Sequence, residues 1–362
     1  HQPGDYRPGD FNPERLILDD ELVDTTPMNV GDEFETDPAG VLHYSFGNFK
    51  LFVTGDPGRV DNDLDREITD AVGPQELAVA TVNVENLHSP DLIAIEEMQD
   101  NSGFTDDGTV AADQSWERLI EAIDVAGGPV YDYRQIDPEN NADGGAPGGN
   151  IRVGFLFRTD IGLTFAPGTA GGSTTAVSVS SSGNSADPVA VSHNPGRIDP
   201  TDSAFSSSRK PLVGKFFFNG EPVFVIGNHW NSKGGDNPLF GRYQPPVLSS
   251  ATQRGQQADL VAAFVDDVQA IDPVARVVVA GDLNDFEYSA AVQKLVTAGL
   301  TDLPAELPDS ERYGYVYEGN SQVLDHLLIS GFAAHSYDVV HVNAEFADQL
   351  SDHDPSVVRL TL

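Results

Sequence analysis

Short polar clusters in this sequence contain the residue types that hydrolysis of a phosphate ester needs, and each stands at the end of an apolar, strand-like run. The clusters are Asn83, Glu96-Glu97, Ser208–Pro211, Asn228-His229, Gly281–Asp285, Asp325-His326 and Ser351–Asp354. Each cluster alone has an ordinary explanation, such as an Asx turn that closes a strand at Gly281–Asp285. Together they place carboxylates, amides, an arginine and histidines at successive strand ends, which indicates one shared site.

The oxygen-bearing side chains of these clusters predict a divalent cation site. The carboxylates of Glu97 and Asp352 and the amide oxygen of Asn83 are hard ligands, suited to Mg²⁺ or Mn²⁺, with Ca²⁺ as a further candidate. Such a cation neutralises a phosphate oxygen and stabilises the leaving alkoxide. The spacing alone leaves Glu96 and Glu97 as alternatives for the ligand.

The remaining clusters predict acid–base chemistry without a covalent intermediate. Asp325 with His353 forms a carboxylate–imidazole pair suited to general acid–base catalysis or charge stabilisation. We expect Asp282 to orient or deprotonate the attacking water, and Asn284 or an arginine to hold charge that develops on phosphorus. The absence of cysteine and of a G-x-S-x-G elbow agrees with direct attack by water.

Two regions of different character must position these residues. Residues 1–60 are predicted to be rich in β-structure, with strand-like runs at Glu14–Asp19 and Gly40–Phe52, and residues 61–76 read as a linker. From residue 77 to 362, apolar strands alternate with fewer helical segments, which predicts a layered α+β sandwich with its site at the strand ends. The stretch between Gly168 and Ser208 is rich in Gly, Ser, Thr and Pro and predicts long surface loops.

Composition excludes several functional classes. With 362 residues, 39% of them hydrophobic, the chain can bury a substantial core. No apolar stretch reaches the ~18–20 residues of a transmembrane helix, which argues against a membrane partner. The absence of cysteine excludes disulfides, a thiolate nucleophile and Cys-ligated metals. The chain begins at His1 without a basic and apolar leader, and we expect it to be a processed product.

The charge balance predicts a protein adapted to high salt. Twenty Lys and Arg residues against 57 Asp and Glu residues give a net charge of −37, and only five of the basic residues are lysines. Such self-repulsion is screened when the Debye length falls to ~3 Å at 1 M salt. Taken alone, this charge argues against a nucleic-acid partner.

Seven motifs, in order, resemble those of the endonuclease/exonuclease/phosphatase superfamily. They are TVNVEN, DLIAIEEMQD, SSRKPLVGKF, GNHWNSK, GDLND, VLDHLLIS and SDHDP. The resemblance spans residues 77–362 and implies a deoxyribonuclease-I-like, four-layered α/β/β/α sandwich. Within the superfamily, the chain looks most like prokaryotic extracellular nucleases in which an oligonucleotide-binding (OB) β-barrel precedes the catalytic domain. Residues 1–60 would then be a partial OB-like domain whose first strands lie before His1.

The resemblance also implies roles for individual residues, and its motif pattern favours Glu97 over Glu96. The metal ligands would be Asn83, Glu97 and Asp352. The catalytic residues would be His229, Asp282, Asn284, Asp325 and His353. The residues that bind substrate would be Arg209, Asn228 and Lys233.

One connection departs from the family pattern. The strand-like runs Leu77–Val84 and Asp91–Met98 are separated by little more than Glu85–Pro90, whereas parallel neighbours need a crossover of about a dozen residues or more. Either the two strands are antiparallel, or residues are missing near Leu87-His88. The resemblance favours the second interpretation, because it implies a helix between these strands.

These observations predict a secreted, metal-dependent nuclease that cleaves DNA, with RNA as a further candidate substrate, and with little sequence preference. Because Arg209, Lys210, Lys215 and Lys233 lie in or beside the motifs, we expect a small positive island at the cleft. Alternatives are a phosphomonoesterase, a lipid phosphodiesterase of the sphingomyelinase type, and a DNA-binding protein without catalysis. The oligomeric state stays open.

Overall fold

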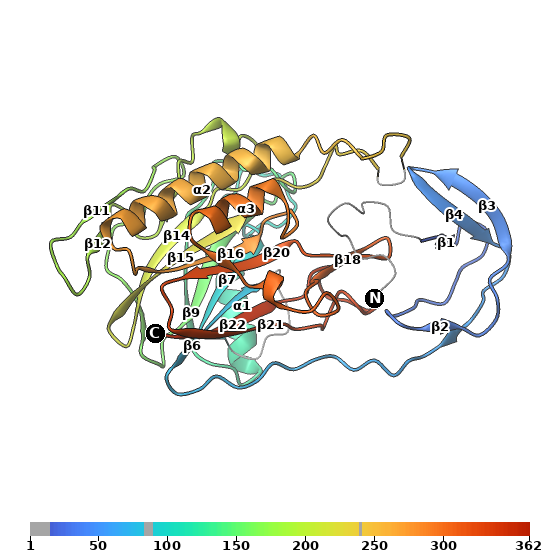
Figure 1. Ribbon diagram of the computed structural model, residues 1–362, viewed down its shortest axis with the longest axis horizontal. Helices are drawn as coiled ribbons and strands as arrows, with labels where there is room; N and C mark the ends of the chain where they lie inside the picture. Colours follow the sequence, from blue (N-terminus) through green and yellow to red (C-terminus); the bar gives the residue numbers. More distant parts are fainter. Residues whose placement is uncertain (1–14, 83–89, 239–240) are drawn as a thin grey trace.

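The computed structural model describes residues 15–82, 90–238 and 241–362. Most of the chain forms a mixed α+β fold with two large sheets and few helices (Figure 1). None of the described helices is long and apolar enough to cross a membrane.

The first large sheet carries β15 and β16, the two strands that precede the Asn228-His229 and Gly281–Asp285 clusters. Its order is β10-β14-β15-β16-β20-β17, with β13 paired to β14. The strands are β10 (Leu163–Phe165), β13 (Gly196–Arg197), β14 (Leu212–Phe218), β15 (Glu221–His229), β16 (Arg276–Asp282), β17 (Thr301–Asp302) and β20 (Asp325–Ser330). β15 and β16 are parallel and their apolar runs are buried, as expected for strands covered on both faces.

The second large sheet has the order β21-β22-β6-β7-β9-β8. Its strands are β6 (Glu76–Val82), β7 (Leu92–Met98), β8 (Tyr131–Gln135), β9 (Arg152–Arg158), β21 (Ala334–Val339) and β22 (Ser356–Thr361). β6 and β7 pair in parallel, with Val79 opposite Leu92, so the antiparallel alternative for these strands is wrong. Only residues 83–91 connect them, which is too short for the helix implied by the resemblance; residues 83–89 lie outside the described part of the chain.

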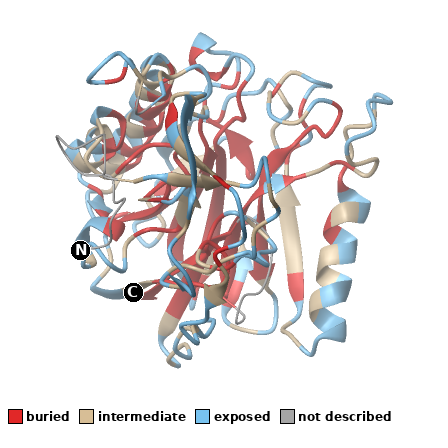
Figure 2. Cartoon of the chain, turned by 90° about the vertical axis from the view of Figure 1, so that its right-hand side faces the viewer, coloured by how far each residue is buried: buried red, intermediate tan, exposed pale blue. Residues whose placement is uncertain are grey.

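Three apolar cores hold four layers together. One core lies between the sheets and includes Phe155 and Phe216. A second packs α1 (Asp113–Val125) onto the sheet of β6 and β7 through Trp116. The third packs α2 (Ala251–Ile271) and α3 (Ala290–Thr297) onto the sheet of β15 and β16. Figure 2 shows the buried residues concentrated in the strands. The predicted α/β/β/α sandwich is therefore confirmed.

The N-terminal region forms two small sheets. β1 (Ile17–Asp19) pairs in parallel with β4 (Asn48–Val53), which pairs with β3 (Gly40–Ser45), while β2 (Glu33–Phe34) pairs with β5 (Arg59–Val60). The run predicted as a single strand at Gly40–Phe52 is thus a hairpin, because Phe46 and Gly47 take positive φ values of 51° and 78° at its turn. The sheets of residues 15–60 are not closed into a barrel, and the OB-like identity of residues 1–60 stays a prediction.

The segment predicted as a linker lies against the catalytic sandwich. Arg66 donates from Nε to the carbonyl of Val342 at 2.9 Å, and the Glu67 amide donates to the His341 carbonyl at 3.1 Å. Farther along, Arg359 of β22 donates to the carbonyl of Asp70. Figure 1 shows this stretch running from the small sheets back along the sandwich. These contacts hold residues 66–70 against the sandwich.

The segment predicted as long surface loops is partly structured. It contains the hairpin of β11 (Val179–Ser181) and β12 (Val189–Val191) and the 3-10 turn η1 (Ser203–Phe205). Val189 and Ile198 are buried in the core beside α2. A second 3-10 turn, η2 (Pro304–Glu306), and the hairpin of β18 (Tyr315–Tyr317) and β19 (Asn320–Gln322) precede β20.

Candidate active site

Three neighbouring strands of one sheet bring three of the predicted catalytic residues into a single row. His229 ends β15 and lies opposite Asp282, the last residue of β16; Asp282 in turn lies opposite Asp325, the first residue of β20. Residues that face each other across paired strands project from the same side of a sheet. Here that side is the inner one, because Ala280 and Leu327, two residues away along β16 and β20, belong to the core between the sheets.

Asp325 fixes and charges the imidazole of His353. Nδ1 of His353 lies 2.5 Å from Oδ2 of Asp325, and both side chains are buried. Burial alone would lower the pKa of His353, but the charge and hydrogen bond of Asp325 outweigh it and raise the pKa to about 10. The ring of Tyr315 lies 4.6 Å from that of His353, centroid to centroid. His353 is therefore a positioned imidazolium at neutral pH, with Nε2 left for a substrate.

Asp282 has the properties of a general base. Burial first, and then the charge of Asp325, raise its pKa to about 7, against the opposing effects of His353, Asn284 and Arg209. Asn284 donates its backbone amide to Oδ1 and its Nδ2 to Oδ2 of Asp282, both at 2.7 Å. The Asx turn expected at Gly281–Asp285 is present, and the same turn orients the Asp282 carboxylate. Near neutral pH this carboxylate can accept a proton from water.

His229 completes the row as a neutral imidazole. Its Nε2 lies 3.5 Å from Oδ2 of Asp282 and 3.9 Å from Oε1 of Glu97. Burial, then the charges of Arg209 and His353, lower its pKa well below the usual range. Its buried Nδ1 has no hydrogen-bond partner within the described ranges. His229 is thus placed to orient a polar group between the two sheets.

A β-bulge turns two consecutive glutamates toward this site. The pairing of β7 with β9 shifts register between Ile95 and Met98, and Glu97 takes a φ of 60°. Glu96 is fully buried and accepts a hydrogen bond from Oγ1 of Thr81 at 2.9 Å. Burial, then the charges of Asp325 and Asp282, raise the pKa of Glu96 well above its usual range. From spacing alone, Glu96 and Glu97 were alternatives for the metal ligand. In the structure, the bulge brings both carboxyls to the site.

The donor set at this edge fits a divalent cation. Oε2 of Glu96 is buried without a hydrogen-bond partner in the described part of the chain, and Glu97 keeps 47% of its side chain exposed beside His229. Several carboxyls that raise one another's pKa form a place where a cation is favourable. Asn83 lies outside the described residues, and Asp352 is exposed next to His353. No group of three or more His, Asp or Glu side chains among the described residues is arranged to hold a metal, so the set Asn83, Glu97 and Asp352 stays a prediction.

The expected positive island is largely neutralised. Lys210 is 9% exposed and pairs with Asp143 at 2.7 Å, and Lys215 is 5% exposed and pairs with Asp187 at 2.5 Å. Arg209 is also buried; it donates to the carbonyl of Trp230 at 2.7 Å. Burial lowers the pKa of Arg209, and the charges of Asp282 and Glu97 oppose this effect. Arg209 therefore acts as a cation behind the site, while the two lysines are structural.

The other two residues predicted to bind substrate, Asn228 and Lys233, lie in different places: Asn228 faces away from the site and Lys233 lies at its rim. Asn228 is fully buried, and because strand side chains alternate it faces α2 rather than the site occupied by His229. Its amide donates to the carbonyl of Ile226 and accepts a hydrogen bond from Nε1 of Trp230, so it supports the fold rather than a substrate. Nζ of Lys233, in contrast, donates to the carbonyl of Asn284 at 2.8 Å, at the rim of the site.

Tyr315 and Arg254 contribute to the site without having been predicted. The ring of Tyr315 lies beside that of His353, tilted by 41°. Arg254 is fully buried on α2, where its Nε lies 2.9 Å from Oδ2 of Asp285. Arg254 thereby anchors the turn that carries Asp282. Arg254 is the one basic residue of α2, which was the available signal for it, whereas nothing in the local sequence marks Tyr315.

His326 faces away from the site and stabilises the same turn from the other side. Its Nδ1 lies 2.9 Å from Oδ1 of Asp302 and its Nε2 lies 2.9 Å from the carbonyl of Asp285. Both partners are acceptors, so both ring nitrogens must carry a proton. Burial opposes this charge, but Asp302 outweighs it and raises the pKa of His326 to about 9.

We expect the stability of the protein to fall as pH rises through this pKa. The pKa of His326 is raised from about 6.5 in the unfolded chain to about 9 in the folded protein, so protonation of His326 stabilises the fold. This stabilisation, about 3 kcal/mol, is fully present below pH ~6.5 and is lost as the pH rises toward and past 9. The difference in unfolding free energy between the wild type and His326→Gln should therefore shrink from pH 6 to pH 10. His335→Gln, at an exposed histidine, is the matched control and should change the unfolding free energy little. A constant difference for His326→Gln would contradict the assignment.

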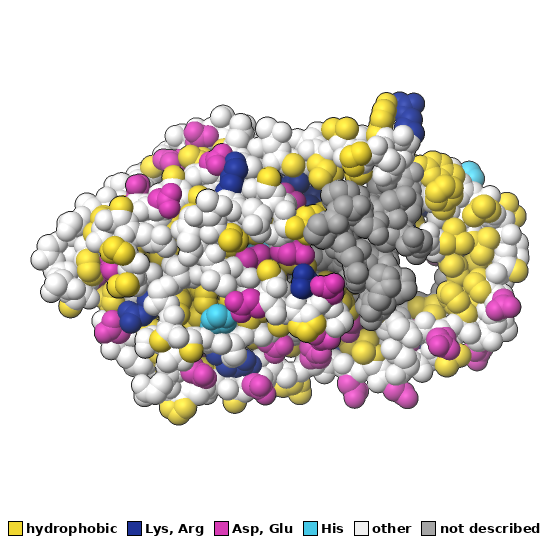
Figure 3. All heavy atoms as spheres, in the orientation of Figure 1, with side chains coloured by type: hydrophobic (Ala, Val, Ile, Leu, Met, Phe, Trp, Pro, Cys, Tyr) yellow, Lys and Arg dark blue, Asp and Glu magenta, His cyan; other side chains and the backbone are white. Residues whose placement is uncertain are grey.

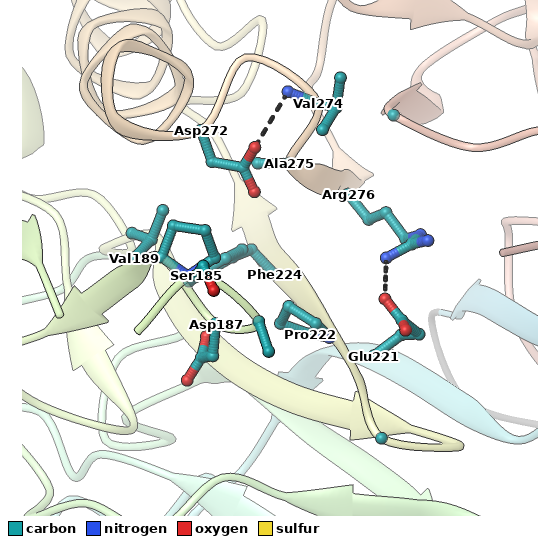
Figure 4. A pocket seen from close by; sticks show the side chains of 14 residues that line it. Ser185, Asp187, Val189, Glu221, Pro222, Phe224, Asp272, Val274, Ala275 and Arg276 are labelled. Atoms are coloured by element: carbon teal, nitrogen blue, oxygen red, sulfur yellow. Dashed lines mark hydrogen bonds and ion pairs between the residues drawn. The ribbon is translucent and has the colours of Figure 1, made fainter. Parts of the chain in front are cut away.

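A separate pocket of about 370 Å³ lies at the opposite end of the same sheet (Figure 4). It is bordered by Glu221 and Arg276, the first residues of β15 and β16, which form an ion pair at 2.9 Å. The candidate catalytic residues His229 and Asp282 stand at the other ends of these strands. This pocket is therefore separate from the candidate site.

Two family models match the sequence. Residues 185–347 match the model of the "Endonuclease/Exonuclease/phosphatase family". Residues 4–62 match a domain of unknown function, DUF8508. No curated protein matched the sequence.

Solved structures with a similar course of the chain have low sequence identity. An endonuclease/exonuclease/phosphatase family protein from Bacteroides thetaiotaomicron is 15% identical, with a TM-score of 0.48, over 80% of this chain and 96% of that one. D. rerio TDP2 complexed with single strand DNA product is 13% identical (TM-score 0.45; 79% and 99% covered). The B. thetaiotaomicron mannosyl-6-phosphatase is 15% identical (TM-score 0.45; 79% and 100% covered). At this level, the likeness assigns no activity to this chain.

Proposed function

We propose that this chain is a member of the endonuclease/exonuclease/phosphatase family, whose model matches residues 185–347, and that it is a phosphodiesterase that hydrolyses DNA by direct attack of water. One observation carries the proposal: a base with a pKa of about 7, Asp282, lies in the same row as Asp325, which holds the imidazolium of His353. A base and a fixed cation on the same inner face are what attack on a phosphate diester requires.

In the proposed reaction, Asp282 accepts a proton from water as the water oxygen attacks phosphorus. Asn284 keeps both oxygens of that carboxylate oriented. The bond from phosphorus to the leaving oxygen then breaks. The leaving oxygen takes a proton from solvent water, and Asp282 returns the proton it accepted to solvent. Nε2 of His353 donates a hydrogen bond to the phosphoryl group and offsets its growing negative charge. His229, neutral and buried, orients a polar group on the same side.

A divalent cation fits the carboxylate edge of the site. Enzymes of this superfamily typically use divalent metal ions. Here Asn83, Glu97 and Asp352 would hold Mg²⁺ or Mn²⁺, with Glu96 contributing negative charge behind them. When bound, the cation would supply charge neutralisation at a phosphate oxygen and at the leaving oxygen.

DNA is the proposed substrate because the N-terminal region adds aromatic side chains beyond the catalytic sandwich. Tyr44, Phe46 and Phe49 on the β3–β4 hairpin are each at least 45% exposed. Figure 3 shows hydrophobic side chains gathered over this part of the molecule. Exposed aromatic side chains stack on nucleobases. RNA offers the same bases and is a further candidate.

A phosphomonoesterase is the second candidate. The net charge of −37 and the burial of Lys210 and Lys215 favour it, because a small phosphate ester needs less positive surface than a DNA strand. The same net charge supports the proposal that the protein works in high salt, where repulsion of a polyanion is screened. Secretion stays a prediction from the resemblance.

Cleavage of supercoiled plasmid tests both the proposed hydrolysis of DNA and the proposed activity in high salt. We expect nicking with Mg²⁺ or Mn²⁺, none with EDTA, and activity that persists when NaCl is raised from ~0.1 M to above 1 M, where the Debye length falls from ~10 Å to ~3 Å. An intact plasmid, together with rapid release of phosphate from a phosphomonoester, would favour the second candidate. Loss of activity only at high salt would contradict the halophilic part of the proposal.

A further inference from the structure

A pocket of about 330 Å³ lies where the N-terminal sheet meets the catalytic sandwich. Its size is at the lower end of the ~300–1,000 Å³ found for small-ligand sites. Its walls come from three separate parts of the chain: the β1–β4 region, the loop after β15 with the turn after β16, and the β18–β19 hairpin. The residues that the argument uses are Arg15, Phe46, Asn48, Lys233, Phe286 and Tyr317.

Specific contacts hold the pocket together. The turn of the β3–β4 hairpin packs so closely on the loop after β15 that a Cβ on Gly47 would lie 2.1 Å from Cβ of Pro238. Arg15 donates to Oδ1 of Asn48 at 2.6 Å and lies 3.3 Å from Glu318 in the β18–β19 turn. Asn48 also donates to Glu318. The N-terminal sheet is therefore docked at a defined position beside the candidate active site.

Two paths connect the pocket directly to the candidate active site. On one side, Lys233 lines the pocket and donates to the carbonyl of Asn284, the residue that orients Asp282. On the other side, Tyr317 lines the pocket and stacks on Tyr315 with ring centroids 6.3 Å apart and planes 10° apart. Tyr315 in turn lies against His353. The pocket is thus linked through Asn284 to Asp282 on one side and through Tyr315 to His353 on the other.

The chemistry of the walls favours a flat, uncharged ring over a phosphate. Phe46 is 89% exposed and Tyr317 is 55% exposed, so both rings are available for stacking. The two cations of the pocket are already paired, Arg15 with Glu318 and Lys233 with Asp285 at 3.4 Å. Lys233 also lies 4.1 Å above the ring of Phe286. With its cations balanced by carboxylates, the pocket offers aromatic faces rather than excess positive charge.

We propose that this pocket holds one nucleobase of an unpaired DNA strand, next to the phosphate that is cleaved, with Phe46 of the N-terminal region as the stacking residue. The proposal rests on the proposed phosphodiesterase function. A base inside a duplex would first have to leave its stack, which costs a few kcal/mol. The protein therefore prefers single-stranded DNA, or frayed ends, over intact duplex. The N-terminal region becomes part of the substrate site rather than an independent module.

Binding of a short labelled strand tests the pocket separately from catalysis. The probe is a ten-nucleotide single strand, measured by fluorescence anisotropy in EDTA, with a gel to show that it stays intact. Phe46→Ala should weaken binding about 5- to 150-fold, the range expected for the loss of one base–aromatic stack. Phe34→Ala, which removes a 40% exposed ring from β2 outside the pocket, is the matched control and should bind like the wild type.

A strand with abasic sites identifies the group that the pocket holds. The wild type should bind the abasic strand more weakly than the normal strand, by the same factor as Phe46→Ala weakens binding of the normal strand. Binding of the abasic strand by Phe46→Ala should be no weaker than with either change alone. Equal binding by wild type and Phe46→Ala, or additive losses, would overturn the pocket assignment. Hydrolysis of bis(p-nitrophenyl) phosphate by the wild type tests the proposed function independently, because this diester contains no nucleobase.

Discussion

Replacing His353 with glutamine lowers kcat for cleavage of a DNA strand by about 10²- to 10³-fold, the usual cost of removing a hydrogen-bond donor that stabilises charge in the transition state. The reason is the pairing of Nδ1 with Asp325 at 2.5 Å, which keeps the imidazole charged and aims Nε2 at the substrate. Glutamine has a similar length but carries no charge. The expected loss is in kcat with little change in KM, because the charge matters most when negative charge grows on the phosphoryl group.

Steady-state kinetics on an oligonucleotide, with thermal unfolding as a check on folding, measure this effect. His335→Gln is the matched control, since His335 is an exposed histidine that pairs with Glu306 at 2.7 Å outside the site. It should retain wild-type kinetics. A folded His353→Gln variant with near-normal kcat would remove His353 from the mechanism.

Asp282→Asn should lower kcat by a comparable factor, about 10²- to 10⁴-fold, because the amide cannot accept a proton from water. Asparagine keeps the size of the side chain, and the Asn284 backbone amide can still donate to its carbonyl oxygen. The variant should also be as stable as the wild type, or more stable, because burial of the carboxylate is unfavourable. Activity and stability thus change in different directions, as expected for a residue selected for catalysis.

The pH profile gives a second measure of the same residue. A base with a pKa of about 7 is protonated and inactive below that pH, so log kcat of the wild type should rise with a slope near one below pH ~7 and level off above it. Asp282→Asn should lose this rise. Asp259→Asn, at an exposed carboxylate that pairs with Lys294, should keep it. An unchanged profile in Asp282→Asn would mean that another group is the base.

The catalytic row could be predicted from sequence because it depends on a regular property of sheets. His229 and Asp282 each end an apolar run and Asp325 begins one. The parallel pairing of β15 with β16 and the antiparallel pairing of β16 with β20 bring all three residues to one edge of the sheet. The layers follow in the same way from apolar strands alternating with helical segments. The alternation of side chains along a strand also predicts the orientation of Asn228. Because His229 faces inward, the preceding residue must face the opposite side of the sheet.

The predictions that the structure corrected involve features that leave no pattern in the local sequence. A bulge at Glu96-Glu97 breaks the alternation of β7, so spacing could not tell that both carboxyls reach the site. The carboxylates that neutralise Lys210 and Lys215 lie on distant segments, so the positive island could not be excluded from the motifs. Docking of the N-terminal sheet depends on contacts such as Asn48 with Glu318, which join residues far apart in the chain.

The most direct test of the account uses one molecule with both kinds of phosphate ester. A single-stranded oligonucleotide with a terminal 5′-phosphate is incubated with the protein and Mg²⁺ or Mn²⁺ in ¹⁸O-labelled water, and its products are analysed by mass spectrometry. The account predicts shorter fragments in which each newly formed terminal phosphate carries one ¹⁸O atom from the attacking water. Loss of only the terminal phosphate, with the strand otherwise intact, would contradict it and identify a phosphomonoesterase.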